Sequence, residues 1–387
     1  LWGVSDMLGR VRGGRHLRRR ELPGFARSYA FLGVDYGSID TSFTRGAIPC
    51  RTPDGVAHYL EHKMFDLPEG NAMEQYAEYG GGNNAFTNYT MTAYYVECTD
   101  CFEENLKILL RMVTTPYFTD ESVNKERGII EQEIRMYEDN ADSACFENLF
   151  AAMYSRHPAR IPICGSVESI AEITPETLYA CHKAFYDPGN MMLCVIGDVG
   201  AERVAELAKQ YTPAGAQERA VRDYGAAEDM ACRETSVKKK MEVSMPTFAI
   251  GFKCPPAEDG TEAERMDIIG DLAAELLVGE SSALYQRLYE HNQEHPLIPA
   301  LQIGQQLLGF FAVSRQIRGK NVHVISGTDG FLLFLNLCFV QIGDGALDSL
   351  NGSNLIYRLD VDVHNDIAFN VQKILQHKFT WILGIST

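Results

Sequence analysis

The segment HYLEHKMF, residues 58–65, places two histidines and a glutamate at spacings that could form a metal site. On an α-helix, residues four apart lie on one face, about 40° apart around the axis, so His58 and His62 could both face one ion. Imidazole nitrogens are good ligands for Zn²⁺, and Glu61 could accept a proton from a water molecule that the metal activates. This order is the H-x-x-E-H arrangement, the reverse of H-E-x-x-H. The alternative is an exposed helix that carries these residues for solubility.

The chain contains the same pattern a second time, in HNQEH at residues 291–295. Pro296 follows this copy directly, and no glutamate occurs after it that could serve as a third ligand. We interpret the second copy as accidental. The pattern alone therefore does not define a site.

A catalytic zinc site needs a third protein ligand and one open position. The segment NKERGIIEQEIRMYEDN offers Glu126, Glu131 and Glu133. Glu126 and Glu133 are seven residues apart, so they share a helix face, whereas Glu131 points elsewhere. One of the pair could bind the metal while the other hydrogen-bonds a ligating histidine, and spacing alone does not say which. The alternative is a solvated acidic face, which the neighbouring isoleucines and methionine disfavour.

The elements that must position these residues follow from local patterns. A helix is predicted around the first motif, with Thr52 as a candidate N-cap. Strands are predicted in residues 27–36 and in the β-prone stretch 84–98. Helical spacing of apolar residues over 120–154 predicts one long helix, or two helices with a break near residues 140–142.

Changes in composition divide the chain into five predicted segments. The order of a strand and then a helix after the linker echoes the first domain and indicates an internal repeat. The segments are 1–25, basic and disordered; 26–212, the domain that carries both motifs; 213–235, a linker; 236–295, the start of a second homologous domain; and 296–387, an atypical C-terminal segment without glutamate.

Charge and composition exclude some functions. The 387 residues carry a formal net charge of −17, which argues against general nucleic-acid binding. The ten cysteines form no framework and indicate reduced thiols in a cytosolic protein. The apolar run 331–340 is half the roughly 20 residues that a membrane helix needs, and residues 1–25 lack the apolar region of a secretory signal. We therefore expect a cytoplasmic protein that binds neither nucleic acid nor membrane.

Three segments together carry a resemblance: DGVAHYLEHKMF, GGGNNAFTNYTMTAYY and KERGIIEQEIRMYEDN. In this order they resemble the pitrilysin/insulinase family of zinc peptidases, the inverzincins, and especially its bacterial processing-peptidase-like members. The resemblance implies an α+β fold of two homologous domains, each a sheet with helices, of the mitochondrial-processing-peptidase-like metallohydrolase type. The second domain is expected to be incomplete, because the resemblance runs only from about Leu22 to Tyr289.

The resemblance also implies roles for individual residues. His58, His62 and Glu133 match the Zn²⁺ ligands, Glu61 matches the general base, and Glu126 matches the second catalytic glutamate that supports the site. An edge strand is implied to bind an extended peptide substrate by main-chain pairing. Its four residues are Asn84, Ala85, Phe86 and Thr87.

We therefore expect a zinc-dependent endopeptidase that hydrolyses peptides or unfolded protein segments, with a homologous partner subunit or dimer. The alternative is a non-catalytic binding or assembly subunit of a heteromeric processing peptidase. Two departures from the family pattern bear on this choice. The arginine-rich N-terminal segment appears where the family has its first strand, and no match is found for the family's C-terminal substrate-binding Arg and Tyr pair.

Overall fold

The computed structural model describes residues 9–11, 15–21, 24, 26–211, 219–243, 249, 251, 253–254, 260–278, 282–283, 286–287, 310–317 and 320–327. The chain divides into two compact units. The first contains residues 1–137 and 156–226, and the second contains residues 138–155 and 227–387. The first unit therefore ends inside the segment 213–235 that the sequence predicts to be a linker.

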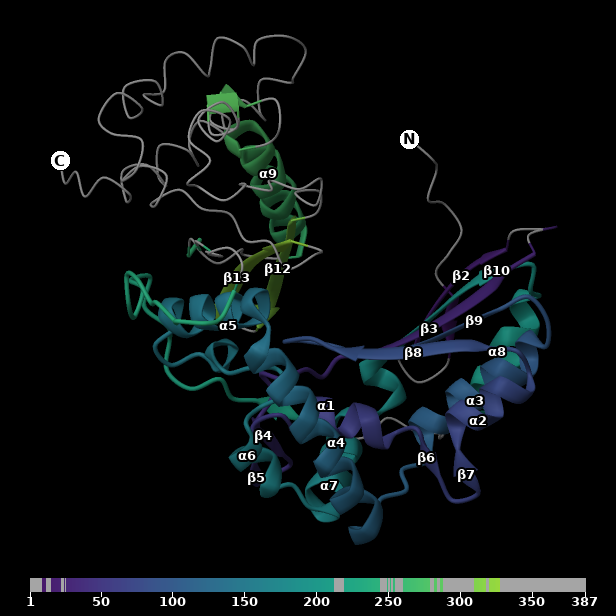
Figure 1. Cartoon of the computed structure of the whole chain (residues 1–387). Coiled ribbons are helices and arrows are strands. Elements are labelled where there is room, and N and C mark those ends of the chain that lie inside the picture. The colour runs from purple at the N-terminus through teal and green to yellow at the C-terminus, as the bar shows by residue number, and fades with distance from the viewer. Residues whose placement is uncertain are drawn as a thin grey trace. The chain divides into compact units, whose positions relative to one another are not determined.

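A six-stranded sheet forms the centre of the first unit, with the order β1-β2-β10-β3-β9-β8 (Figure 1). All neighbouring strands run antiparallel except the parallel pair of β2 and β10. β10 alternates buried and half-buried residues, as expected of a strand with one face on the core. The strands are β1 Gly9–Val11, β2 Arg15–Glu21, β3 Ser28–Val34, β8 Gly82–Thr87, β9 Thr92–Cys98 and β10 Met191–Gly197.

Helices cover one face of this sheet (Figure 1). α3 contacts β3 and β9, α8 contacts β2, and α1 contacts β8 and β9. α3 buries Leu106, Leu109 and Val113 at helical spacing in the same core as Leu32 and Tyr94 of the sheet. The helices are α1 Val56–Lys63, α2 Ala72–Glu78, α3 Phe102–Thr114 and α8 Ala201–Tyr211.

Shorter elements complete the first unit. Arg222, near its end, pairs through Nε with the buried carboxylate of Asp40 at 2.9 Å, which fixes this part of the chain to the unit. The elements are β4 Ser42–Arg45, β5 Ile48–Arg51, β6 Asp66–Leu67, β7 Gly70–Asn71, α6 Val167–Ala171, α7 Pro175–Phe185, β11 Val221–Arg222 and 3₁₀ turns at Pro158–Arg160 and Pro188–Asn190.

The long helical stretch is broken where a polar residue can cap a new helix. α4 spans Asp120–Asp139 and α5 spans Ala141–Met153. Asn140 between them has extended backbone, and its side chain accepts a hydrogen bond from the Ser143 amide at 2.9 Å. Of the two alternatives that the sequence left open, one long helix or two helices with a break near residues 140–142, the structure shows the second. The division between the units lies close to this break, near the end of α4, because residues 138–155 belong to the second unit.

The prediction of a disordered segment over residues 1–25 is wrong for the part that the structure describes. The arginine-rich residues Arg15–Glu21 form β2, which pairs with β10 from Met192 opposite His16 to Gly197 opposite Glu21. The segment is therefore itself a strand of the sheet. Main-chain hydrogen bonds to β10 can hold a strand whatever its side-chain composition, so local propensity is overridden by tertiary context.

The helices and strands described in the second unit, apart from the last residues of α4, are α5, α9 Gly260–Val278 and the hairpin of β12 Phe310–Ile317 with β13 Lys320–Gly327. α9 confirms the helix expected after the linker. The second H-x-x-E-H copy at 291–295 and the apolar run 331–340 lie outside the described residues.

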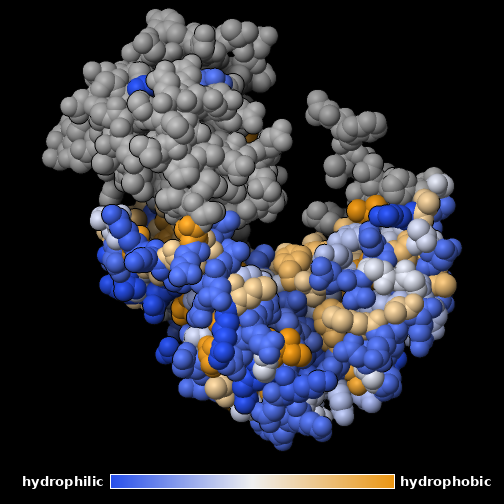
Figure 2. Space-filling view, in the orientation of Figure 1, coloured by the Kyte–Doolittle hydropathy of each residue, from blue (hydrophilic) through white to orange (hydrophobic). Residues whose placement is uncertain are grey.

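In the described ranges no helix is long and apolar enough to cross a membrane. Where Figure 2 colours the surface, it is mainly hydrophilic, with hydrophobic residues in separate groups. The α+β class is confirmed.

Candidate metal centre

α1 begins where a glycine allows the chain to turn. The N-cap is Gly55, whose φ of 88° lies in the left-handed region that favours glycine. A Cβ on Gly55 would lie 2.3 Å from the carbonyl oxygen of Cys164, so the close approach of these segments also requires glycine. The prediction of Thr52 as N-cap is wrong, because the Thr52 hydroxyl instead donates to the Thr41 carbonyl at 3.3 Å.

The structure brings His58, His62 and Glu133 together. His58 Nε2 lies 3.6 Å from Glu133 Oε1, and His62 Nε2 lies 3.5 Å from Glu133 Oε2. One potential ligand atom from each residue lies within 4.8 Å of the others. Contact with His58 lowers the pKa of Glu133, although partial burial opposes the shift. The carboxylate that the sequence placed 71 residues beyond His62 thus faces both imidazoles.

This donor set fits a zinc ion. Two ligands at about 2.1 Å from a tetrahedral centre lie roughly 3.4 Å apart, close to the observed separations between the imidazole nitrogens and the carboxylate oxygens. Two imidazoles and one carboxylate also leave the fourth position open, as catalytic zinc sites require. The arrangement could therefore hold the metal without a large rearrangement of α1 or α4.

Glu126 lies outside the cluster of potential ligands and contacts one of its histidines. Its Oε1 is 3.0 Å from His62 Nδ1, the ring nitrogen that does not face Glu133. Burial alone would raise the pKa of Glu126, but the hydrogen bond with His62 and nearby positive charges bring this pKa below its usual value. Such a carboxylate fixes the tautomer and ring orientation of a ligating histidine. The geometry thus distinguishes the two glutamates that helix spacing alone left equivalent.

Glu61 is buried beside the histidines and directed by a residue of the neighbouring sheet. Thr87, at the end of β8, donates a hydrogen bond from Oγ1 to Glu61 Oε2 at 2.6 Å. Burial raises the pKa of Glu61, and the electrostatic influence of His58 and the hydrogen bond from Thr87 partly oppose this shift. A carboxylate with a raised pKa accepts a proton more readily than an ordinary surface glutamate. This arrangement is suitable for a general base.

The segment Asn84–Thr87 lies on β8, at the edge of the six-stranded sheet. One side of its backbone is paired with β9, and no strand that the structure describes pairs with the other side. Asn84 and Phe86 are exposed, whereas Ala85 and Thr87 are half-buried. An edge of this kind can pair with an extended peptide. The Thr87 hydroxyl is directed at Glu61, a role that the sequence analysis did not foresee.

Sequence reasoning missed three further residues around this centre. Cys164 Sγ lies 3.9 Å from His58 Nε2. Tyr59 and Lys63, on α1 itself, bond to the backbone of α4. The motif gives their positions, at one residue after each histidine, but a buried lysine carries no signal that distinguishes it from an exposed one.

Comparison with known proteins places two consecutive parts of the chain in one family. The model of insulinase, peptidase family M16, matches residues 51–166. The model of the M16 peptidase inactive domain matches residues 172–322. The first match contains the histidine motif and Glu133, so the candidate metal centre lies inside the region that the insulinase model matches.

Relatives and solved structures agree with these matches. The uncharacterized zinc protease YmfH of Bacillus subtilis is 38% identical over 278 residues, which are 69% of this chain and 64% of YmfH. Zinc protease PqqE of Helicobacter pylori is 25% identical over 245 residues, 61% of this chain and 54% of PqqE. The chain thus spans less than two thirds of these relatives.

A crystal structure described as an M16-like peptidase from Alicyclobacillus acidocaldarius aligns with a TM-score of 0.70 and 25% identity, covering 100% of this chain and 86% of that chain. A protease from Helicobacter pylori shares the fold with a TM-score of 0.64 and 19% identity, covering 95% of this chain and 85% of that chain. The chain belongs to the insulinase family of peptidases, family M16.

Proposed function

We propose that this protein is a zinc-dependent endopeptidase that hydrolyses peptides or unfolded protein segments. The observation that carries the proposal is the convergence of His58, His62 and Glu133 beside a buried Glu61. An exposed helix that carried these residues only for solubility would not direct them at one another and at a glutamate from a distant helix. Relatives that are named zinc proteases support the choice of metal.

In the proposed mechanism His58, His62 and Glu133 hold a Zn²⁺ ion, which supplies Lewis-acid activation of water and of the scissile carbonyl. The Glu61 carboxylate accepts a proton from the attacking water and then donates it to the departing amine as the peptide C–N bond breaks. Thr87 keeps Oε2 of this carboxylate in place. Glu126 holds the His62 ring through Nδ1, so that Nε2 faces the centre.

The substrate is proposed to pair with the free edge of β8. The end of β8 lies next to the proposed base, because Thr87 contacts Glu61, so a peptide paired with this edge would run past the metal centre. Main-chain pairing requires an extended segment and places little restriction on side chains. This favours peptides or unfolded segments over folded proteins.

Metal analysis and a cleavage assay test the proposal. The purified chain is expected to bind one equivalent of zinc, and H62A is expected to lose it, whereas E131Q on the same helix is expected to retain it. A quenched fluorescent peptide is expected to be cleaved by the wild type and not by E61Q, which keeps the size of the side chain but cannot accept the proton. Cleavage that survives E61Q would contradict the role of Glu61.

The second candidate is a non-catalytic binding or assembly subunit of a heteromeric processing peptidase. The match of residues 172–322 to a domain described as inactive favours it. Such a subunit would bind peptide in the E61Q form and in the wild type with equal affinity, and would cleave in neither. In both cases we propose a homologous partner subunit or dimer and a cytoplasmic location.

A further inference from the structure

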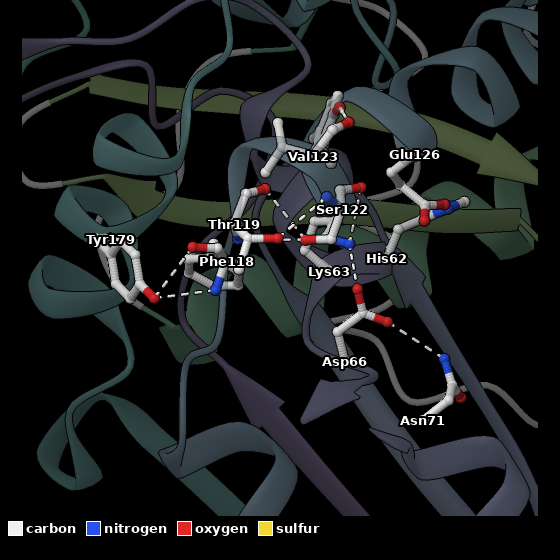
Figure 3. Close-up of polar contacts among 11 residues, drawn as sticks. His62, Lys63, Asp66, Asn71, Phe118, Thr119, Ser122, Val123, Glu126 and Tyr179 are labelled. Atoms are coloured by element: carbon white, nitrogen blue, oxygen red, sulfur yellow. Dashed lines mark hydrogen bonds and ion pairs between the residues drawn. The ribbon is translucent and has the colours of Figure 1, made fainter. Parts of the chain in front are cut away.

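A buried lysine lies directly behind the proposed metal centre. Only 1% of the Lys63 side chain is exposed. Its ammonium group pairs with Asp66 and donates a hydrogen bond to the backbone carbonyl of Ser122, at 3.2 Å. Asp66 Oδ1 in turn accepts a hydrogen bond from Asn71 Nδ2 at 3.3 Å. Figure 3 shows Lys63 between Asp66 and Ser122, near the pair of His62 and Glu126. A side chain that normally extends into solvent is thus directed into the protein.

Tyr59 makes a second bond of the same kind. Its hydroxyl donates to the backbone carbonyl of Val123. Tyr59 and Lys63 are four residues apart and share one face of α1, about 100° around the axis from His58 and His62. α1 therefore meets α4 through two rows. In the first row, His58 and His62 contact glutamate carboxylates of α4. In the second row, Tyr59 and Lys63 bond to backbone carbonyls in the first turn of α4.

The part of α4 that receives these bonds is itself fixed. The Ser122 amide donates to Thr119 Oγ1 at 3.1 Å, and the Thr119 amide donates to Ser122 Oγ at 3.3 Å. Tyr179 of α7 accepts a hydrogen bond from the Phe118 amide at 3.0 Å. Figure 3 shows Thr119 and Ser122 near Lys63, and Tyr179 on the far side of Phe118. Lys63 therefore joins α1 to a backbone whose position is set by local capping and by a third helix.

Stability alone does not explain an ammonium group at this place. Removing a charge from water is costly, and an ion pair offsets that cost only when its geometry is excellent and its remaining protons are bonded. A methionine of similar length would fill the same space without that cost. The ammonium group differs from a methionine in its directional bonds, which restrict how far apart α1 and α4 can lie and how they are rotated.

That restriction matters because the metal ligands come from both helices. Two ligands lie on α1 and the third on α4, and ligand distances in a metal site are tolerated only within about 0.2 Å. A small shift of one helix against the other would move both imidazoles away from Glu133 together. Groups that hold a metal ligand in place without touching the metal typically raise the affinity for the metal by about 10–100-fold.

We propose that Lys63 is a positioning residue of the metal centre: its bonds to Asp66 and the Ser122 carbonyl set the spacing of α1 and α4 at which His58, His62 and Glu133 can share one ion. This inference rests on the proposed zinc site. It assigns Lys63 no contact with substrate or metal.

The test compares K63M with K107M. Lys107 lies on α3, is one-third exposed and makes only surface ion pairs with Glu103 and Glu104 among the described residues. Zinc affinity is measured by competition with a chelator of known affinity, stability of the metal-free protein by urea unfolding, and ligand geometry by the visible absorption of the Co²⁺ form. We expect K63M to bind zinc about tenfold or more weakly with an altered Co²⁺ spectrum, and K107M to match the wild type.

A folded K63M with zinc affinity within about twofold of the wild type and an unchanged Co²⁺ spectrum would overturn the inference, even if its unfolding free energy were lower. If K63M does not fold, Y59F and D66N replace it, because each removes one bonding group at nearly constant size. Each is then expected to weaken zinc binding by about threefold or more, and unchanged affinity in both overturns the inference. If the wild type binds no zinc, the proposed function itself fails.

Discussion

Replacing Glu126 by glutamine tests how the second carboxylate of α4 contributes to the site. The Glu126 carboxylate lies 3.0 Å from His62 Nδ1, and its side chain is only 18% exposed, so the contact is a partly buried, charge-assisted hydrogen bond. Such bonds contribute about 1.5–3 kcal/mol. If this energy serves to hold the ring for the metal, the loss in E126Q corresponds to about 10–100-fold weaker zinc binding. Glutamine keeps the shape but removes the charge that fixes the tautomer.

The assay is chelator competition on the metal-free protein, with E131Q as the matched control. Glu131 lies on the same helix and pairs with Arg135, away from the histidines. E126Q is expected to retain one zinc site of reduced affinity, because the three proposed ligands are unchanged. Equal zinc affinity in E126Q and E131Q would refute the reasoning. Complete loss of binding with a folded protein would instead indicate that Glu126 is itself a ligand.

Three further changes have expected outcomes. T87V removes the hydroxyl that directs Glu61 and is expected to lower kcat by about tenfold while zinc content stays at the wild-type level, as measured by peptide cleavage and metal analysis; unchanged kcat would show that Glu61 needs no such support. G55A places a Cβ against the Cys164 carbonyl in a left-handed conformation, and we expect the unfolding free energy in urea to fall by about 1–3 kcal/mol. Burial lowers the pKa of His182 to about 4, although its bond to a backbone carbonyl opposes this. Because the unfolded chain takes up this proton near pH 6.5 and the folded chain only near pH 4, the folded state loses up to about 3 kcal/mol as the pH falls through this window. H182Q is expected to lack this loss of stability at low pH. Profiles of unfolding free energy against pH that run parallel for H182Q and the wild type would contradict this prediction.

Much of the site follows from residue spacing, because an α-helix has a fixed period. The positions i and i+4 of His58 and His62 put both on one face, and the interval of seven puts Glu126 and Glu133 on another. Spacing cannot say which way a carboxylate faces across the gap between helices. The resemblance assigned the role of metal ligand to Glu133 and a supporting role to Glu126. In the structure the two glutamates are separated by the nitrogen of His62 that each contacts: Glu133 lies near Nε2 and Glu126 near Nδ1.

Other features depend on tertiary contacts that no local pattern contains. Gly55 rather than Thr52 caps α1, because the backbone near Cys164 approaches too closely for any side chain. Residues 15–21 form a strand because β10 offers a partner, although a run of arginines predicts exposed coil. Lysine normally indicates a solvated surface, so the burial of Lys63 could not be predicted from its type. The break at Asn140 was predictable because asparagine at a helix N-terminus is a local signal.

The way the centre is divided between two helices has a consequence for stability. Glu126 and Glu133 lie on α4, both histidines lie on α1, and the described contacts that fix α1 against α4 include Tyr59 and Lys63 on α1. Zinc binds only when the two helices are correctly spaced, so it must stabilise that spacing in return, by about 2.7 kcal/mol at a concentration of 100 times Kd. By this reciprocity, any substitution that loosens the contact between the helices weakens zinc binding. It must also reduce the increase in Tm that a fixed zinc concentration produces. A substitution that loosened this contact while leaving both the zinc affinity and the increase in Tm unchanged would show that the metal binds elsewhere than between α1 and α4.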